Sequence, residues 1–321
     1  METTTKIYSL EQIKSVLDFS EIIKEIADGF VLYSEKKTVV PPVGYLAIKN
    51  PPADVHIKYG YILNDDFYVV KIASGFYENP NFGLPSSNGL MLVFSQKTGE
   101  LLSILLDEGY LTDIRTAAAG AVAARCLAPK EFEKIGIVGC GIQARLQLLL
   151  LSEVTDCRSV IVWGRSRDRL DEYKIEMRRH GFDIETTRDI SDITANCRLI
   201  VTTTPSTAPL IFADQLKKGT HITALGADAP GKQELDPKIF GLADIIVADS
   251  LTQCLEHGEL AGIGKNGIVP KTTVWELGKI ITKPKLQRNN DEQITVADLT
   301  GVAVQDIQIA KYVFQQLQYN N

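Results

Sequence analysis

A glycine-rich turn near the middle of the chain has the residue types that bind a dinucleotide. The apolar run 135–138 leads into Gly139-x-Gly141-x-x-Ala144, and a helical pattern follows. Gly139 allows a tight turn, Gly141 lets backbone N–H groups approach a pyrophosphate, and Ala144 permits close packing of the helix on the strand. The motif is weak alone, but the strand before it and the helix after it are the context that it requires. These residues therefore predict a cofactor site.

A basic turn follows the next apolar run, residues 159–163. In dinucleotide-binding folds the end of the second strand meets the adenosine ribose, and an acidic residue there favours NAD. Here Arg165, Ser166 and Arg167 occupy the position, and they can hold a 2′-phosphate. We therefore expect NADP(H) to be preferred over NAD(H). The alternative is an ordinary basic turn in solvent.

Other residues could bind or react with a substrate. Thr203 and Asp228 stand at the carboxyl ends of two later apolar runs, where ligands of parallel sheets bind. Asp228 could be a general acid or base, or only a turn or cap aspartate. Lys71 lies inside the apolar run YVVKIAS, so it either faces a site or extends its stem to water. Arg115, expected in the first turn of a helix with a face of alanines, could point into a cleft.

The elements around these residues predict an α/β chain with two architectures. The first third begins with two helices, one capped by Ser9 and one beginning at Ser20, and continues with alternating runs typical of an antiparallel sheet. From residue 135 onward, short apolar runs alternate with helical patterns, which predicts a Rossmann-like, doubly wound parallel sheet. The expected strands are 56–62, 67–72, 89–94 and 101–106, with a hairpin between the last two, and then 135–138, 159–163, 199–203, 221–225 and 245–247.

Composition and charge exclude several classes of protein. The chain has 321 residues, of which 45% are hydrophobic and 23% charged, as in an ordinary globular protein of two domains. With a net charge of −6, the chain lacks the overall positive charge that is typical of nucleic-acid-binding proteins. No apolar run reaches the roughly 18 residues of a membrane helix, and the N-terminus lacks the apolar core of a signal peptide. The scattered cysteines and histidines predict reduced thiols, no metal site and a cytoplasmic location.

Taken together, the motifs resemble those of the ornithine cyclodeaminase/mu-crystallin family of NAD(P)-dependent proteins. They occur in the family's order across nearly the whole chain, and the RTAAA and GADAPGK segments are more specific than the glycine motif. The matching stretches are Val70–Ile72, Gly83–Ser86, the hairpin around Thr98 and Gly99, Leu111–Ala119, Gly139–Ala144, Thr203–Ser206, Gly226–Lys232 and Thr300–Asp306.

The resemblance implies two domains. Residues 1–117 with 300–321 would form an α+β domain that binds substrate and makes a homodimer through its sheet. Residues 118–299 would form the Rossmann-like NAD(P)-binding domain. A C-terminal helix, about Val302–Leu317, would return to the first domain. We expect the charged tract Lys271–Glu292 to be a solvated linker.

The resemblance also implies roles for individual residues. Lys71 and Arg115 match a substrate-binding lysine and arginine, Ser86 matches a hydroxyl residue that contacts substrate, and Asp228 matches the proposed acid/base. Many members have a carboxylate-binding arginine after the second helix, but residues 39–46 contain none, and we hypothesise that Lys58 supplies that cation. The cofactor positions implied in addition are Ile142, Gln143, Thr204, Leu225, Lys232 and Gly301.

These residues favour an NADPH-dependent reductase of an imine or ketimine with an adjacent carboxylate, which would give an L-amino acid. Pyrroline- or piperideine-2-carboxylate are examples of such substrates. The alternative is an ornithine cyclodeaminase, which converts L-ornithine to L-proline and releases ammonia. A third possibility is a cofactor-loaded binding protein like mu-crystallin. The basic turn at Arg165 favours the reductase, and the presence of Lys71, Arg115 and Asp228 together argues against an inert scaffold.

Overall fold

The computed structural model describes residues 5–319. Residues 1–4, part of the segment in which we expect no signal peptide, and residues 320–321 lie outside this description. The chain forms two compact units, Met1–Arg115 with Val302–Asn321, and Thr116–Gly301. Within residues 5–319, no helix is both long and apolar enough to cross a membrane.

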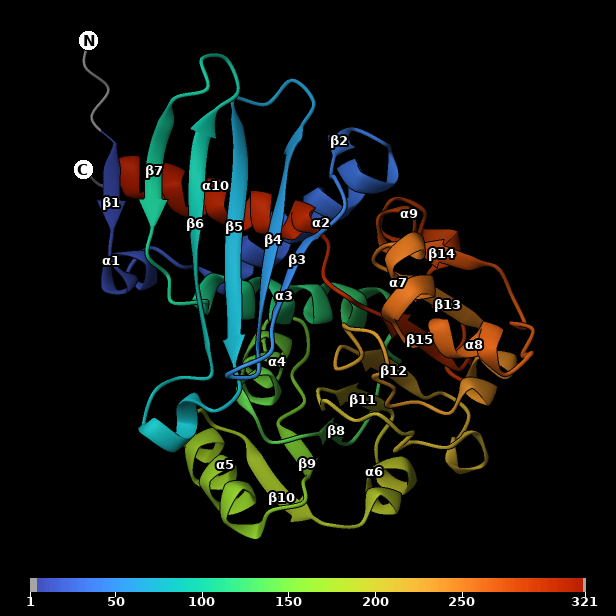
Figure 1. Cartoon of the computed structure of the whole chain (residues 1–321). Helices are drawn as coiled ribbons and strands as arrows, with labels where there is room; N and C mark the ends of the chain where they lie inside the picture. Colours follow the sequence, from blue (N-terminus) through green and yellow to red (C-terminus); the bar gives the residue numbers. More distant parts are fainter. Residues whose placement is uncertain (1–4, 320–321) are drawn as a thin grey trace. The chain divides into compact units, whose positions relative to one another are not determined.

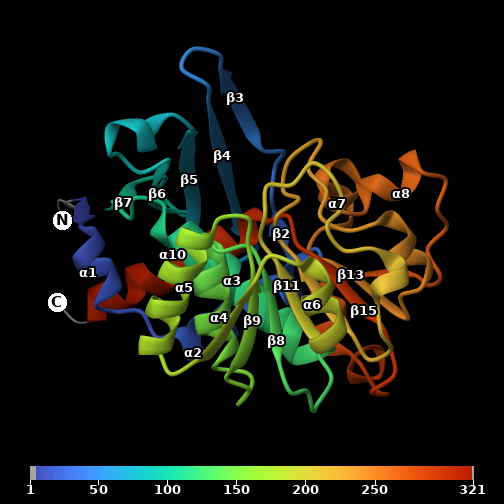
Figure 2. The ribbon, with the colours of Figure 1, turned by 90° about the horizontal axis from the view of Figure 1, so that it is seen from below.

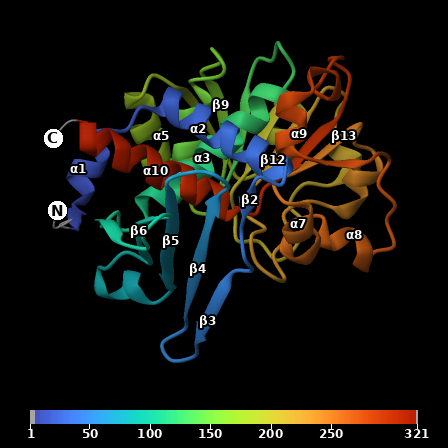
Figure 3. The same ribbon diagram turned by 90° about the horizontal axis from the view of Figure 1, so that it is seen from above.

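The first unit contains a seven-stranded sheet with the order β1-β7-β6-β5-β4-β2, and β3 pairs with β4 off this path. Its strand pairs are antiparallel except for β1 and β7, which are parallel. Figures 2 and 3 show β3 and β4 as a hairpin that extends away from the other strands. The alternating runs correctly predicted four of the strands, and the short β1, β2 and β3 were missed. The bounds are β1 Lys6–Tyr8, β2 Thr38–Val39, β3 Gly44–Ile48, β4 Ala53–Ile62, β5 Phe67–Phe76, β6 Ser87–Ser95 and β7 Leu101–Leu105.

Helices pack on one another and on this sheet. The capping box of α1 (Leu10–Lys14) forms between Ser9 and Gln12 as predicted. Helix α2 (Phe19–Ser34) does not begin at Ser20, because the Asp18 carboxylate accepts the Glu21 N–H and is the N-cap. Figure 1 shows α10 (Ala303–Tyr319) crossing the sheet strands, and it contacts β4, β5, β6 and α2. Most of α10 is therefore buried, and its C-terminal end is exposed.

The second unit contains an eight-stranded sheet in which every pair is parallel. Its order is β10-β9-β8-β11-β12-β15-β13-β14, so the chain reverses direction across the sheet between β8 and β11. The five expected strands are present. Their residues are apolar without alternation because both faces of a parallel sheet are covered. The bounds are β8 Ile135–Val138, β9 Ser159–Trp163, β10 Asp183–Thr187, β11 Leu199–Thr202, β12 His221–Ala224, β13 Ile245–Ala248, β14 Val274–Glu276 and β15 Thr295–Asp298.

Helices follow most of these strands, and the start of α3 differs from the sequence prediction. Helix α3 begins earlier than expected, because Asp107 accepts the Leu111 N–H at 2.9 Å, so Arg115 lies in its second turn. The helices are α3 Tyr110–Leu127, α4 Ile142–Leu151, α5 Arg167–Arg179, α6 Ile190–Asn196, α7 Leu251–His257, α8 Ala261–Lys265 and α9 Leu277–Thr282.

The predicted solvated linker over residues 271–292 is wrong. This tract contains β14 and α9, and the side chains of Leu277 and Ile280 are fully buried. The following strand, β15, lies between β12 and β13 in the sheet. A few apolar residues among many charged ones were enough to pack this segment against the second unit's sheet.

Candidate functional site

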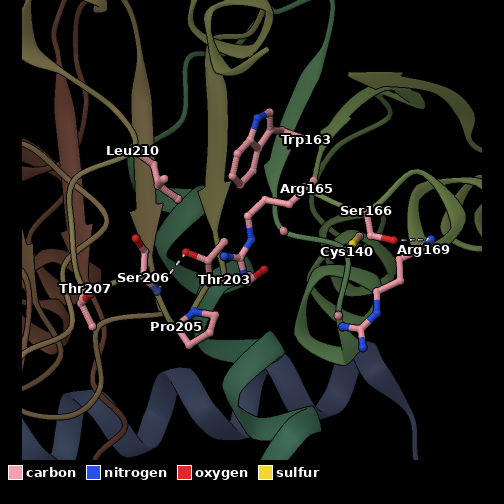
Figure 4. A pocket seen from close by; sticks show the side chains of 14 residues that line it. Cys140, Trp163, Arg165, Ser166, Arg169, Thr203, Pro205, Ser206, Thr207 and Leu210 are labelled. Carbon is pink, nitrogen blue, oxygen red and sulfur yellow. Dashed lines mark hydrogen bonds between the residues drawn. The ribbon is translucent and has the colours of Figure 1, made fainter. Parts of the chain in front are cut away.

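A cavity of about 650 Å³ opens at the carboxyl ends of β8, β9 and β11 in the second unit. Strands β8 and β11 are the neighbours between which the chain reverses direction, and such switch points are where open α/β sheets bind ligands. Figure 4 shows the side chains around it. The cavity is lined by Gly139, Cys140, Gly141, Trp163, Gly164, Arg165, Ser166, Arg169, Thr203, Thr204, Pro205, Ser206, Thr207 and Leu210.

The glycine turn forms one wall of this cavity. Gly139 has φ of +117°, and a Cβ there would stand 2.6 Å from the Thr203 hydroxyl, so no other residue fits. Gly141 caps α4 without a side chain, and a Cβ built on it would meet nothing within 4 Å. No side chain caps α4, and an uncapped helix N-terminus beside a glycine turn is the arrangement that a dinucleotide pyrophosphate requires. Ala144 is fully buried behind the turn, while Ile142 is exposed.

An arginine that the sequence analysis missed holds this turn in place. Arg145 Nη1 donates to the carbonyl oxygens of Cys140 and Gly141 at 2.5 and 3.1 Å. Its Nε also pairs with Glu176 at 2.6 Å. These contacts fix the backbone of the turn, and they come from a helix position that the glycine motif does not specify.

The basic turn forms the opposite side of the cavity. Arg165 and Ser166 line it, as expected, but Arg167 does not, and Arg169 does. Ser166 is the N-cap of α5 and accepts the Arg169 N–H at 3.5 Å. Residues two apart on a helix point in different directions, so Arg167 and Arg169 cannot both face the cavity. In Figure 4, Arg165 and Arg169 extend toward it from the end of β9 and the start of α5.

Thr203 and Thr204 line the cavity, but other expected cofactor residues are not among its lining residues. Leu225 is buried and donates its N–H to the Thr202 carbonyl at 3.0 Å. Gly301 donates its N–H to the Asp249 carboxylate at 2.7 Å. A cofactor role for these residues stays a prediction. The expected residues outside the cavity lining are Ile142, Gln143, Ala144, Arg167, Leu225, Lys232 and Gly301.

Asp228 lies on the loop that follows β12. Its carboxylate forms an ion pair with Lys232 Nζ at 2.6 Å, and about half of its side chain is exposed. Two predicted functional residues are therefore in direct contact. The half-exposed carboxylate of Asp228 is accessible to a substrate, where it could take part in proton transfer or stabilise a cation.

The first unit contains a buried group of charges around Lys71. Lys71 and Arg115 are 2% and 5% exposed, so the interpretation of Lys71 as an edge lysine that reaches water is wrong. Both cations approach the same oxygen of Asp306, with distances from Lys71 Nζ and Arg115 Nε of 3.1 Å each. Arg115 Nη1 also donates to the Gln305 side chain at 2.5 Å. Asp306, itself buried, was part of a recognised motif but had been given no role.

Lys58 belongs to the same group of charges. It stands directly opposite Lys71 in the pairing of β4 with β5, so the two side chains share a face of the sheet. Burial lowers the pKa of Lys71 to about 7, although Asp306 opposes this shift, and the Arg115 and Lys58 charges add to it. Burial disfavours the Asp306 carboxylate, yet Arg115, Lys71 and Lys58 hold its pKa below the usual value. The Asp306 carboxylate thus lies among three cationic side chains.

Ser86 is exposed just before β6, and its carbonyl oxygen accepts the Phe76 N–H at 2.7 Å. Its contact with substrate stays a prediction. Within the described part of the chain, no group of three or more His, Cys, Asp or Glu side chains could hold a metal ion.

Comparisons with known proteins extend over the whole chain. The model of the ornithine cyclodeaminase/mu-crystallin family matches residues 3–321. An uncharacterized cyclodeaminase of Sinorhizobium fredii is 38% identical over 320 residues, which cover 98% of this chain and 96% of the relative. An archaeal alanine dehydrogenase dimer with bound NAD has a TM-score of 0.89 and 32% identity, with 99% and 97% of the two chains covered. The Δ1-pyrroline-2-carboxylate reductase of Thermococcus litoralis, in complex with NADH and L-proline, has a TM-score of 0.92 and 25% identity, with 98% of each chain covered.

Proposed function

The chain belongs to the ornithine cyclodeaminase/mu-crystallin family, and on this premise we propose that it is an NADPH-dependent reductase of an imine with an adjacent carboxylate. The product would be an L-amino acid, formed for example from pyrroline- or piperideine-2-carboxylate. The observation that carries this proposal is the group of cations around Asp306 in the first unit, in which Lys71 and Arg115 are buried and Lys58 is half-buried. We assign substrate binding and dimerisation to this unit, and NADP(H) binding to the second.

The cavity of the second unit fits a dinucleotide phosphate. The uncapped N-terminus of α4 suits the pyrophosphate, and Arg165, Ser166 and Arg169 suit a 2′-phosphate. The structural neighbours hold NAD or NADH, and the preference for NADPH rests on these basic residues of this chain. When bound, the nicotinamide supplies the hydride for reduction.

The first unit's charges would bind and orient the substrate carboxylate. Arg115 and Lys71 are held by Asp306, so their donor groups keep fixed positions. Lys58 would provide the cation that the expected arginine supplies in other family members. Fixed orientation of a reacting carbon can lower a barrier by about 7–11 kcal/mol in favourable cases.

Asp228 would exchange a proton with the imine nitrogen of the substrate. An imine accepts hydride readily only when it is protonated. A nearby carboxylate stabilises that iminium cation, or the protonated carboxylic acid donates the proton to the imine nitrogen. In the reverse direction Asp228 would accept the proton.

A second candidate is an ornithine cyclodeaminase, supported by the 38% identical relative that is named a cyclodeaminase. That reaction begins by oxidising the substrate and ends by reducing a cyclic imine, so it would use the same cations and carboxylate. A binding protein without turnover is the third candidate and is favoured by no contact in either unit. We also infer a homodimer, supported by the dimeric alanine dehydrogenase, and a cytoplasmic location.

One assay on purified protein separates these candidates. NADPH and NADH oxidation would be followed with pyrroline-2-carboxylate, with piperideine-2-carboxylate, and with pyruvate or glyoxylate plus ammonia or methylamine. Ammonia release from ornithine would be measured in parallel. NADPH oxidation with an imine, and no ammonia from ornithine, is the expected result. Ammonia release with a catalytic amount of cofactor would establish the cyclodeaminase instead.

A further inference from the structure

A single buried carboxylate joins the cofactor cavity to the loop that carries Asp228. The Glu234 side chain is 0% exposed. Its Oε1 accepts the Thr204 N–H at 2.6 Å and the Thr204 hydroxyl at 2.7 Å. Its Oε2 accepts the Thr202 hydroxyl at 2.6 Å and the Gly226 N–H at 2.9 Å. Four donors from two neighbouring strand ends therefore converge on two oxygens.

The two oxygens of the Glu234 carboxylate contact two features with different roles, the cavity wall and the Asp228 loop. Thr204 lines the cavity. The loop that carries Asp228 and Lys232 begins at Gly226 and ends at Glu234. The hydrogen bond from the Gly226 N–H to the Glu234 carboxylate therefore joins the first and last residues of this loop. The backbones also meet there, because a Cβ on Gly226 would stand 2.1 Å from the Thr204 carbonyl oxygen.

The backbone of Glu234 is itself fixed, so its carboxylate has little freedom to move. Its N–H donates to the Glu259 carboxylate at 2.7 Å, and the adjacent Leu235 N–H donates to the same carboxylate at 3.0 Å. Its carbonyl oxygen accepts the N–H groups of Leu210 and Ile211 at 2.7 and 3.1 Å. Leu210 is another lining residue of the cavity.

We propose that Glu234 is the positioning residue of the second unit: it sets the Thr204 wall of the cofactor cavity and the loop of Asp228 in one arrangement. This inference rests on the proposed function, because it assumes that the cavity binds NADP(H) and that Asp228 acts on the substrate. Glu234 would contact neither NADP(H) nor the substrate directly. It would act through its hydrogen bonds with Thr204 and Gly226. Cofactor affinity and turnover should therefore both depend on a residue outside the cavity lining.

The chemistry of the contact explains why a carboxylate is needed. The Thr204 and Gly226 N–H groups can only donate, and they contact different oxygens of Glu234. A glutamine has the same shape but only one acceptor oxygen, so Glu234→Gln leaves either the Thr204 or the Gly226 N–H facing an NH₂ group. A buried N–H without an acceptor is costly, so that part of the structure must move. The Thr202 hydroxyl, by contrast, can rotate and accept.

The test is direct titration of Glu234→Gln with NADPH and with NADH, together with steady-state kinetics and thermal unfolding. We expect the Kd of both cofactors to rise about tenfold or more and kcat to fall. The control is Thr295→Val, which alters an equally buried side chain at the start of β15, where its hydroxyl donates to the Leu127 carbonyl at 2.9 Å. It should lower the unfolding temperature and leave the Kd within about twofold.

The outcomes separate this inference from the proposed function. If the wild-type protein binds neither dinucleotide, the proposed function fails. If the wild type binds but Glu234→Gln has unchanged Kd and kcat, or if Thr295→Val raises the Kd equally, the positioning role is wrong. If Glu234→Gln does not fold, Thr202→Val removes one donor from the same carboxylate without altering a lining residue. It should raise the Kd by a few fold, and an unchanged Kd would overturn the inference.

Discussion

Lys71 Nζ and Asp306 Oδ1 lie 3.1 Å apart, and both side chains are almost completely excluded from solvent. An isolated charge in such a place would be very costly, and one oxygen of Asp306 serves both Lys71 and Arg115. The pair therefore keeps an ammonium inside the first unit while leaving its charge only partly neutralised. A substrate carboxylate would complete the neutralisation.

This arrangement predicts a pH dependence of substrate binding. The pKa of Lys71 is lowered to about 7, so the side chain is charged below neutral pH and loses its charge as the pH rises. We expect the KM for the imino acid to increase above pH 7. Lys71→Met should lower kcat/KM by about ten- to hundredfold, since hydrogen bonds to charged groups contribute about 1.5–3 kcal/mol.

The measurement is kcat/KM between pH 6 and 9 for the wild type and for Lys71→Met. The difference between the two profiles isolates Lys71 from the titration of the substrate itself, and it should shrink as the pH rises. Lys97→Met serves as the control, because its ion pair with Asp66 is exposed. A constant difference across the pH range would show that the Lys71 charge does not bind substrate.

The arginines of the basic turn predict how the protein distinguishes its cofactors. Arg165→Ala and Arg169→Ala each remove a cation that lines the cavity, whereas Arg167→Ala removes a neighbouring cation that does not line it. The first two variants should weaken NADPH binding about ten- to hundredfold and NADH binding much less. Arg167→Ala should change neither by more than about twofold. Titration of the three variants with both cofactors tests this, and equal losses for NADPH and NADH would contradict a 2′-phosphate site.

The sequence predicted the glycine turn and the parallel strands because these depend on local pattern, whereas the roles of Lys71, Arg115 and Asp228 stay predictions. It could not predict that Arg169, and not Arg167, lines the cavity. Which side chains of α5 face the cavity depends on the residue at which the helix begins, and the Ser166 N-cap determines that residue. Asp306 was part of a recognised motif, and Glu234 lies two residues beyond another, Gly226–Lys232. Their roles depend on contacts with strands and helices distant in the chain, which periodicity does not reveal.

The same dependence on tertiary contacts explains the failed linker prediction. Strand β14 has only three residues, too few for a recognisable alternation, and α9 is short. Their positions follow from the pairing of β14 with β13 and from the burial of Leu277 and Ile280. Charged residues dominate the composition of this tract, so composition alone did not indicate that Leu277 and Ile280 are buried.

Asp228 should be required for turnover and not for cofactor binding. It is outside the cavity lining and about half exposed, so Asp228→Asn should preserve the fold and the NADPH Kd. Loss of a general acid or base typically lowers kcat by about 10²–10⁴-fold. Single-turnover kinetics and NADPH titration of this variant are the measurement. A large rise in the NADPH Kd would show instead that the aspartate serves the cofactor site through Lys232.

Asp298, at the end of β15, predicts a second pH dependence, this time of stability. Its side chain is 1% exposed, and Oδ2 accepts the Leu260 N–H at 2.9 Å. Burial raises its pKa from 3.8 to about 7, the Leu260 and Glu259 N–H groups oppose the shift, and the Asp249 charge adds to it. Between pH 4 and 7 the folded protein therefore keeps a proton that the unfolded chain releases. The stabilisation from this group is complete below about pH 4 and is lost as the pH rises to about 7, by at most roughly 4 kcal/mol.

Asp298→Asn should remove this dependence, because the amide oxygen can still accept the Leu260 N–H and the side chain no longer titrates. The measurement is the free energy of unfolding from urea titrations at several pH values between 5 and 8. The wild-type value should fall more steeply with increasing pH than that of Asp298→Asn, and at pH 8 the variant should be at least as stable as the wild type. Parallel slopes would mean that Asp298 is already ionised in the folded protein at pH 5. The Leu260 and Glu259 N–H groups would then outweigh the cost of burying its charge.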